Sequence, residues 1–185
     1  MPVAVDFGFI HTLEGVRVLT GYVPDASGSD SGVTIGSGVD LGQRSSADLD
    51  RLGLSATLKA KLEPYLGLKK QDAVDKLEAE PLSVSKAEAD ELDEAVKRQH
   101  VDALIAKFDA ASETRFENLD AARQTVIASV SFQYGVALNR RAPNFWRQIT
   151  EGDWEGALAN LRNFGDRYTT RRNKEADLLE PTIEV

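Results

Sequence analysis

The sequence contains no cysteine and only two histidines, and it has no long apolar run. Without cysteine the chain has no disulfide, no zinc–thiolate site and no thiol nucleophile. His11 and His100 are too few to form a metal cluster, and we expect neither to lie near a serine partner. No segment approaches the roughly 20 apolar residues that a membrane-spanning helix needs. These absences argue against thiol, metal and intramembrane chemistry.

The chain also lacks an excess of positive charge. It carries 22 Lys and Arg against 30 Asp and Glu, and residues 45–119 alone hold 11 basic and 16 acidic side chains. Because duplex nucleic acid is bound mainly by neutralising its phosphates, this acidic middle argues against a nucleic-acid partner. The first residues, MPVAVDFGFIHTLEG, have neither a basic region nor a long apolar region. We therefore expect no signal peptide, and another route of delivery if the protein acts outside the cytoplasm.

What the sequence does contain is typical of a folded globular protein. Its 185 residues, 42 % of them hydrophobic and 28 % charged, suffice for one domain or for one domain in two lobes. An apolar stripe at Phe7, Ile10 and Leu13 predicts a first helix that ends near Gly15. In residues 16–42 two short β-type runs flank the loop ASGSDSG, and this pattern predicts a hairpin or a small sheet.

The rest of the chain is predicted to be helical. Ser85 and Glu88 form a capping-box pattern at the start of a long helix. The segment AARQTVIASVSFQYG behind Asp120 is apolar nearly all round, so it should be a buried central helix. The sequence thus predicts an α+β, mostly helical domain with a ligand cleft between two lobes. Its parts are an N-terminal lobe over residues 1–84 (first helix, β segment, short helices), a long connecting helix over 85–111 and a helical C-terminal lobe over 112–185.

Two groups of polar residues could carry chemistry. Glu14, at the end of the first helix, is expected to be partly shielded by apolar neighbours, which suits a general acid; a solvated glutamate is the alternative. Thr34, Gly36, Gly38 and Asp40 occupy alternate positions, so a single strand would place them on one face. That face offers a hydroxyl and a carboxylate to bind and deprotonate water, and glycines that let a ligand approach. The alternative is a tight turn in which Asp40 caps the following chain.

Paired carboxylates on opposite sides of a cleft are the usual equipment of glycoside hydrolases. One carboxyl group protonates the leaving oxygen, and the other activates water or attacks the anomeric carbon. Glu14 and Asp40 could fill these two roles. Asp25 and Asp30 are rivals for the second role.

The segments Glu14-Gly15, Tyr22 and Thr34-Ile35-Gly36-x-Gly38 resemble the N-terminal lobe of phage-type lysozymes. Pro24 stands where that family has an Asp two residues after the Tyr, and GYVPD…SGVTIGSGVDLG more closely resembles the pesticin-like branch, the lysozyme-fold killer domains of bacteriocins. In that branch the second carboxylate follows the Thr-Ile-Gly motif. The resemblance implies a two-lobe, lysozyme-like fold. It also implies a catalytic trio and a set of substrate-side residues: Glu14, Thr34 and Asp40, with Tyr22, Gly36 and Gly38.

The resemblance continues toward the C-terminal end. Phe132-Gln133-Tyr134-Gly135 is similar to a family stretch whose Gln faces the sugar cleft. Arg171-Arg172-x-x-Glu175-Ala176 is similar to the family's closing helix, whose first Arg points toward the catalytic Glu. It therefore implies substrate-site roles for Gln133 and Arg171. We expect Trp146 and Trp154 to be core residues rather than sugar-stacking platforms.

The resemblance and the residues together predict a muramidase that cleaves the β-1,4 bond between N-acetylmuramic acid and N-acetylglucosamine in peptidoglycan. We expect inversion at the anomeric carbon, no cofactor and no metal. The partner would be the peptidoglycan glycan strand; a cognate immunity or inhibitor protein fits an effector role, and a monomer is the default. A lytic transglycosylase, an inactive peptidoglycan-binding module and a helical interaction protein are the alternatives. Phage lysis, a bacteriocin or a secretion system would deliver such a protein to the cell wall in the periplasm, and the acidic balance favours an effector or bacteriocin-type domain.

Overall fold

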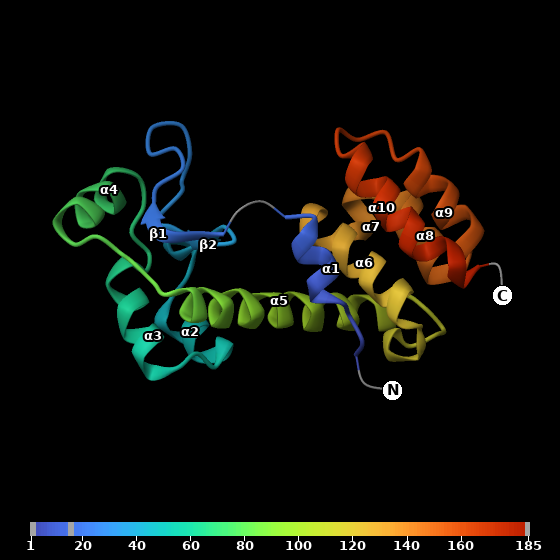
Figure 1. Cartoon of the computed structure of the whole chain (residues 1–185), viewed down its shortest axis with the longest axis horizontal. Helices are drawn as coiled ribbons and strands as arrows, with labels where there is room; N and C mark the ends of the chain where they lie inside the picture. Colours follow the sequence, from blue (N-terminus) through green and yellow to red (C-terminus); the bar gives the residue numbers. More distant parts are fainter. Residues whose placement is uncertain (1–2, 15–16, 184–185) are drawn as a thin grey trace. The chain divides into compact units, whose positions relative to one another are not determined.

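The computed structural model describes residues 3–14 and 17–183. In these residues the chain forms ten α-helices, four short 3-10 helices and one antiparallel sheet of three strands (Figure 1). The mostly helical α+β class predicted from the sequence is therefore confirmed. The chain divides into two compact units, one of residues 1–14 and 100–185 and the other of residues 15–99.

The unit of residues 15–99 holds the sheet, in which the strands follow the order β1-β2-β3 and each is antiparallel to its neighbour. Its core is a cluster of buried side chains, mostly aliphatic, from the sheet and the helices, among them Ile35, Leu49 and Leu92. The elements are β1 (Val18–Tyr22), β2 (Thr34–Gly36), β3 (Val39–Asp40), η1 (Leu41–Gln43), α2 (Ser46–Leu52), α3 (Ala56–Leu62), η2 (Glu63–Tyr65), α4 (Lys70–Ala79) and the first part of α5 (Lys86–Asp109).

The other unit, of residues 1–14 and 100–185, is helical. Helix α6 (Ala121–Tyr134) contacts α1, α7 and α10, which lie around it in Figure 1. Residues 124–131 of α6 are all buried, so the predicted central helix is confirmed. The remaining elements are α1 (Phe7–Thr12), the last part of α5, η3 (Phe116–Asn118), α7 (Leu138–Arg141), α8 (Pro143–Glu151), α9 (Trp154–Arg162), α10 (Thr169–Leu179) and η4 (Glu180–Thr182).

Local capping interactions determine where the predicted helices begin. The Ser85 amide donates to the Glu88 carboxylate at 2.8 Å and the Glu88 amide donates to the Ser85 hydroxyl at 3.2 Å, which is the predicted capping box. Asp120 caps α6 by accepting a hydrogen bond from the Arg123 amide at 2.9 Å. These bonds satisfy amides that have no partner inside the helix.

The three-part division at residues 1–84, 85–111 and 112–185 stays a prediction. Helix α5 runs from Lys86 to Asp109, close to the expected connecting helix. The first helix, α1, contacts α6 and belongs with residues 100–185, whereas we had placed it in the lobe of the β segment. Within residues 3–14 and 17–183 no helix is both long and apolar enough to span a membrane.

The segment from Thr34 to Asp40 is a β-hairpin and not the single strand that the alternation predicted. Strands β2 and β3 pair antiparallel, with Thr34 opposite Asp40 and Ile35 opposite Val39, and a turn at Ser37 and Gly38 joins them. The single-strand prediction is therefore wrong about the local geometry. Because directly opposed residues of an antiparallel pair project to the same face, the hairpin still places the Thr34 and Asp40 side chains next to each other.

Position 36 requires glycine both because of its backbone conformation and because there is no space for a Cβ. Its φ of +64° lies in the left-handed region, and a Cβ there would stand 2.7 Å from the Asp93 carboxylate. We expect Gly36→Ala to reduce the free energy of unfolding by about 2–4 kcal/mol, which combines the backbone cost with overpacking. Urea denaturation followed by circular dichroism measures this loss.

Gly53→Ala is the matched control for Gly36→Ala. Gly53 has a φ of +66°, but a Cβ there would meet no atom within 4 Å. This variant should therefore lose only the backbone contribution, about 1–2 kcal/mol. Equal losses in the two variants would show that the Asp93 contact adds nothing.

Candidate functional site

Thr34 and Asp40 are held tightly in the hairpin. Thr34 is only 4 % exposed, and its hydroxyl donates to the Gly32 carbonyl at 3.3 Å. Asp40 is half-buried, and its Oδ1 accepts hydrogen bonds from the Gly32 amide at 3.1 Å and the Gly42 amide at 2.8 Å. Asp40 thereby caps η1, as the alternative interpretation expected. The cap uses Oδ1, and Oδ2 receives no hydrogen bond from the described residues, so capping leaves one carboxylate oxygen available.

A cavity of about 420 Å³ opens beside this carboxylate. Gly38 borders the cavity and is exposed, as a substrate-side residue would be, whereas Gly36 is buried against Asp93. Tyr22 lies on β1 opposite Thr34 and is 40 % exposed. The cavity is lined by Ser37, Gly38, Val39, Asp40, Gln43, Arg44, Asp48 and Val96.

Asp25 and Asp30, the rivals of Asp40 for the role of second carboxylate, lie in the loop before β2, and each forms a structural contact. Asp25 accepts hydrogen bonds from the Gly28 amide at 2.8 Å and the Ser27 hydroxyl at 3.3 Å, which shapes a turn. Asp30 forms an exposed ion pair with Lys70 at 2.9 Å, and the hydrogen bond and charge of Lys70 lower the pKa of Asp30. Neither residue pairs with Thr34 or lines the cavity, so the geometry favours Asp40.

Asp93 holds the β2–β3 turn in place through hydrogen bonds from Ser37. The sequence analysis did not identify this residue. This carboxylate is 3 % exposed and accepts hydrogen bonds from the Ser37 amide at 2.9 Å and the Ser37 hydroxyl at 2.7 Å. It also forms an ion pair with Arg17 at 2.6 Å. The available signal was an acidic residue directly beside Leu92 in the apolar stripe of the long helix. A buried charge of this kind needs such partners.

Glu14 directly follows the C-cap residue of α1, Leu13, and is half-buried. Its amide donates to the His11 carbonyl at 3.2 Å, which continues the helical turn to the end of the described segment. Gly15, the expected helix stop, lies outside the described residues. Glu14 belongs to the unit of residues 1–14 and 100–185, whereas Thr34 and Asp40 belong to the unit of residues 15–99.

Arg171 lies close to the backbone beside Glu14. Its Nη1 donates to the Leu13 carbonyl at 3.4 Å, and its Nη2 donates to the Ser129 carbonyl at 2.9 Å. Its Nε pairs with Glu175 at 3.1 Å. Arg171 therefore links α10, α6 and the end of α1, and it is well placed to position the segment that carries Glu14.

Gln133 is engaged by a second buried arginine. Its side-chain oxygen accepts a hydrogen bond from Arg172, which also pairs with Glu175 and, at 3.0 Å, with Asp166. Burial alone would lower the pKa of Arg172, but the charges of Glu175 and Asp166 outweigh burial and raise it. This contact gives Gln133 a structural role, and its contact with a sugar stays a prediction.

The expectation that neither histidine has a serine partner is wrong for His100. Its Nε2 lies 2.9 Å from the Ser131 hydroxyl, and its ring stacks on Phe132 with centroids 4.5 Å apart. Burial lowers the pKa of His100, although the Ser131 hydrogen bond opposes this change. Ser131 is fully buried and donates to the Ala128 carbonyl, so this pair is part of the core and does not form a nucleophilic site.

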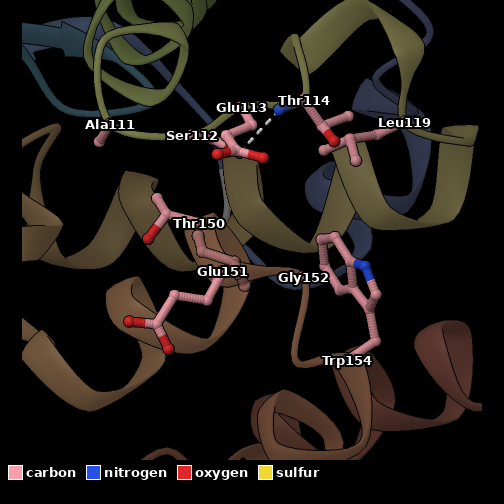
Figure 2. A pocket seen from close by; sticks show the side chains of 10 residues that line it. Ala111, Ser112, Glu113, Thr114, Leu119, Thr150, Glu151, Gly152 and Trp154 are labelled. Carbon is pink, nitrogen blue, oxygen red and sulfur yellow. Dashed lines mark hydrogen bonds between the residues drawn. The ribbon is translucent and has the colours of Figure 1, made fainter.

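A separate cavity of about 410 Å³ lies between the end of α5 and the junction of α8 with α9 (Figure 2). None of the predicted site residues lines it. Trp154 borders this cavity and is half-buried, and the Arg123 guanidinium lies 4.7 Å from the centre of its ring. Trp146 packs against Phe108 and the helical core. Among the described residues no group of three or more His, Asp and Glu is arranged to hold a metal ion.

A family model described as Pesticin, bacterial toxin homologue of phage lysozyme, C-term, matches residues 4–155. The chain belongs to this family. The match includes Glu14, Thr34, Asp40 and Gln133 and ends before Arg171. No curated protein matches the chain. Membership confirms the lysozyme-like α+β fold and indicates a glycoside hydrolase of the lysozyme type that acts on peptidoglycan.

Proposed function

We propose that the protein is a bacteriolytic muramidase that hydrolyses the β-1,4 bond between N-acetylmuramic acid and N-acetylglucosamine. The observation that carries this proposal is that Thr34 pairs across the strands with Asp40, which lines a cavity, within the part of the chain that matches the lysozyme-homologue toxins. A carboxylate next to a hydroxyl is suited to orienting and deprotonating a water molecule.

In the proposed reaction Glu14 donates its proton to the leaving glycosidic oxygen as the bond to the anomeric carbon breaks. Thr34 positions the water molecule, Asp40 accepts one of its protons, and the water oxygen attacks the anomeric carbon. The two amides on Asp40 Oδ1 hold this carboxylate in one orientation. We expect inversion because Thr34 and Asp40 together are suited to holding the attacking water molecule, and NMR of the first product anomer tests this.

The products released from purified peptidoglycan test the proposal. Wild-type protein should reduce the turbidity of sacculi and release muropeptides with reducing ends, identified by mass spectrometry. Anhydro products would indicate a lytic transglycosylase instead. Binding to sacculi without any release would indicate a peptidoglycan-binding module.

Asp40→Asn should lower the hydrolysis rate by about 10²–10⁴-fold, because the amide cannot accept the proton of the attacking water. The Asn oxygen still accepts the two hydrogen bonds from Gly32 and Gly42, so the hairpin should stay folded. Asp30→Asn is the matched control, since Asp30 is 75 % exposed and lies outside the cavity. If Asp40→Asn keeps full activity, Asp40 has no catalytic role and a transglycosylase, which needs one carboxylate, becomes the better assignment.

A further inference from the structure

One arginine, Arg44, lines the Asp40 cavity and has no hydrogen-bond or ion-pair partner for its guanidinium among the described residues. Arg44 is the C-cap residue of η1 and is half-buried. Its guanidinium makes no hydrogen bond or ion pair with any described residue. The other arginines of residues 17–99 all form ion pairs: Arg17 with Asp90 and Asp93, Arg51 with Asp48, and Arg98 with Glu94. Arg44 therefore differs from these arginines, because none of its five N–H donors is used by the part of the chain that the structure describes.

Asp48 and the Oδ1 atom of Asp40, the carboxylate groups near Arg44, have other hydrogen-bond partners. Asp48 accepts hydrogen bonds from the Ser45 amide and hydroxyl, both at 2.7 Å, and pairs with Arg51. Asp40 accepts from two backbone amides through Oδ1, and among the described residues its Oδ2 forms no ion pair with Arg44. Burial lowers the pKa of Arg44, and the charges of Asp48 and Asp40 only partly offset this. A half-buried cation with incomplete charge compensation is stabilised when an anion enters the cavity and pairs with it.

We propose that Arg44 binds a carboxylate of the substrate and so makes the protein prefer peptidoglycan over neutral polymers of N-acetylglucosamine. This inference rests on the proposed function and names the feature of the glycan that its site recognises. Arginine is suited to the task because its planar fork binds a carboxylate through two parallel hydrogen bonds. A protein with a net charge of −8 also needs a local cation where an anionic polymer enters a cavity that contains Asp40 and Asp48.

Two parts of peptidoglycan supply this carboxylate. The lactyl group of muramic acid ends in a free carboxylate when the strand carries no peptide. When a peptide is attached, this carboxyl group forms an amide with it. The acidic residues of an attached peptide then provide the carboxylates. Both sources present the same group to Arg44, and N-acetylglucosamine oligomers present none.

The test compares the affinity of three soluble ligands by isothermal titration calorimetry. The ligands are a neutral N-acetylglucosamine tetramer, a peptide-free peptidoglycan tetrasaccharide with free lactyl groups and the same tetrasaccharide with its peptides. All proteins carry Glu14→Gln so that the ligands survive, and the result does not depend on cleavage. Arg44→Met should weaken binding of at least one anionic ligand about 10–100-fold and leave the neutral ligand unchanged, while Arg44→Lys should retain part of the affinity.

Arg51→Met is the matched control, because Arg51 is 64 % exposed and does not line the cavity. A loss confined to the peptide-free ligand assigns the lactyl carboxylate, and a loss confined to the peptide-bearing ligand assigns the peptide. Equal losses for the neutral and anionic ligands, no loss for any ligand, or no measurable binding of either anionic ligand when Arg44 is present would overturn the inference. Failure of otherwise wild-type protein to cleave sacculi would instead overturn the proposed function.

Discussion

Replacing Glu14 with Gln is expected to lower the rate of peptidoglycan hydrolysis by about 10²–10⁴-fold, because Gln has no proton to donate to the leaving oxygen. Gln has nearly the same shape, and the hydrogen bond that residue 14 donates to the His11 carbonyl comes from its backbone N–H, so the end of α1 should keep its conformation. The rate of turbidity loss with purified sacculi measures the effect, and thermal unfolding checks that the variant is folded.

The control for Glu14→Gln is Glu94→Gln. Glu94 lies on α5, is 67 % exposed and forms a long surface ion pair with Arg98 at 3.8 Å. This variant should hydrolyse peptidoglycan at the wild-type rate. Undiminished hydrolysis by folded Glu14→Gln protein would exclude Glu14 as the general acid and would require another acid in the molecule.

Of the variants proposed for stability measurements, Glu175→Gln is expected to lose the most, about 3–5 kcal/mol in the free energy of unfolding. Glu175 is fully buried and pairs with both Arg171 and Arg172, which are buried as well. It also accepts a hydrogen bond from Ser129. Removing the carboxylate charge leaves two buried cations, of which Arg172 still pairs with Asp166. Denaturant unfolding at pH 7 measures the change.

The matched control for this loss is Glu151→Gln. Glu151 pairs with Arg147 at 2.9 Å four residues away on α8, but both side chains are more than half exposed. Such a surface pair contributes about 0.3–0.5 kcal/mol at most. A comparable small loss in Glu175→Gln would mean that the cluster is solvated, and that Arg171 does not depend on it to hold the Leu13 carbonyl.

The sequence could predict the helices because their signals are local. The capping box at Ser85 and Glu88 and the cap at Asp120 each involve residues three positions apart, so composition and spacing reveal them directly. The apolar character of residues 121–134 likewise predicted burial, since such a helix has no polar face to turn toward water.

The alternation of Thr34, Gly36, Gly38 and Asp40 reflects a hairpin and not the single strand that it predicted. Gly36 and Gly38 serve the turn, with positive φ at both, and the antiparallel pairing then places Thr34 opposite Asp40. Period-two spacing cannot distinguish one strand from a tight hairpin when glycines occupy its centre. The pairing places the two candidate residues side by side, and their choice as catalytic residues stays a prediction.

The sequence by itself determined the α+β class, the helix starts, the buried central helix and the candidate carboxylates, because each depends on neighbouring residues or on a recognisable motif. Only the tertiary structure decided which polar groups pair. Asp93 meets Arg17 across 76 residues and Ser37 across 56, and Arg171 reaches Leu13 across 158. The path of the backbone brings such distant partners together. Residues next to each partner in the sequence therefore do not indicate the pairing. That Arg44 forms no ion pair within residues 3–14 and 17–183 has the same origin, since it depends on where the surrounding carboxylates find their other partners.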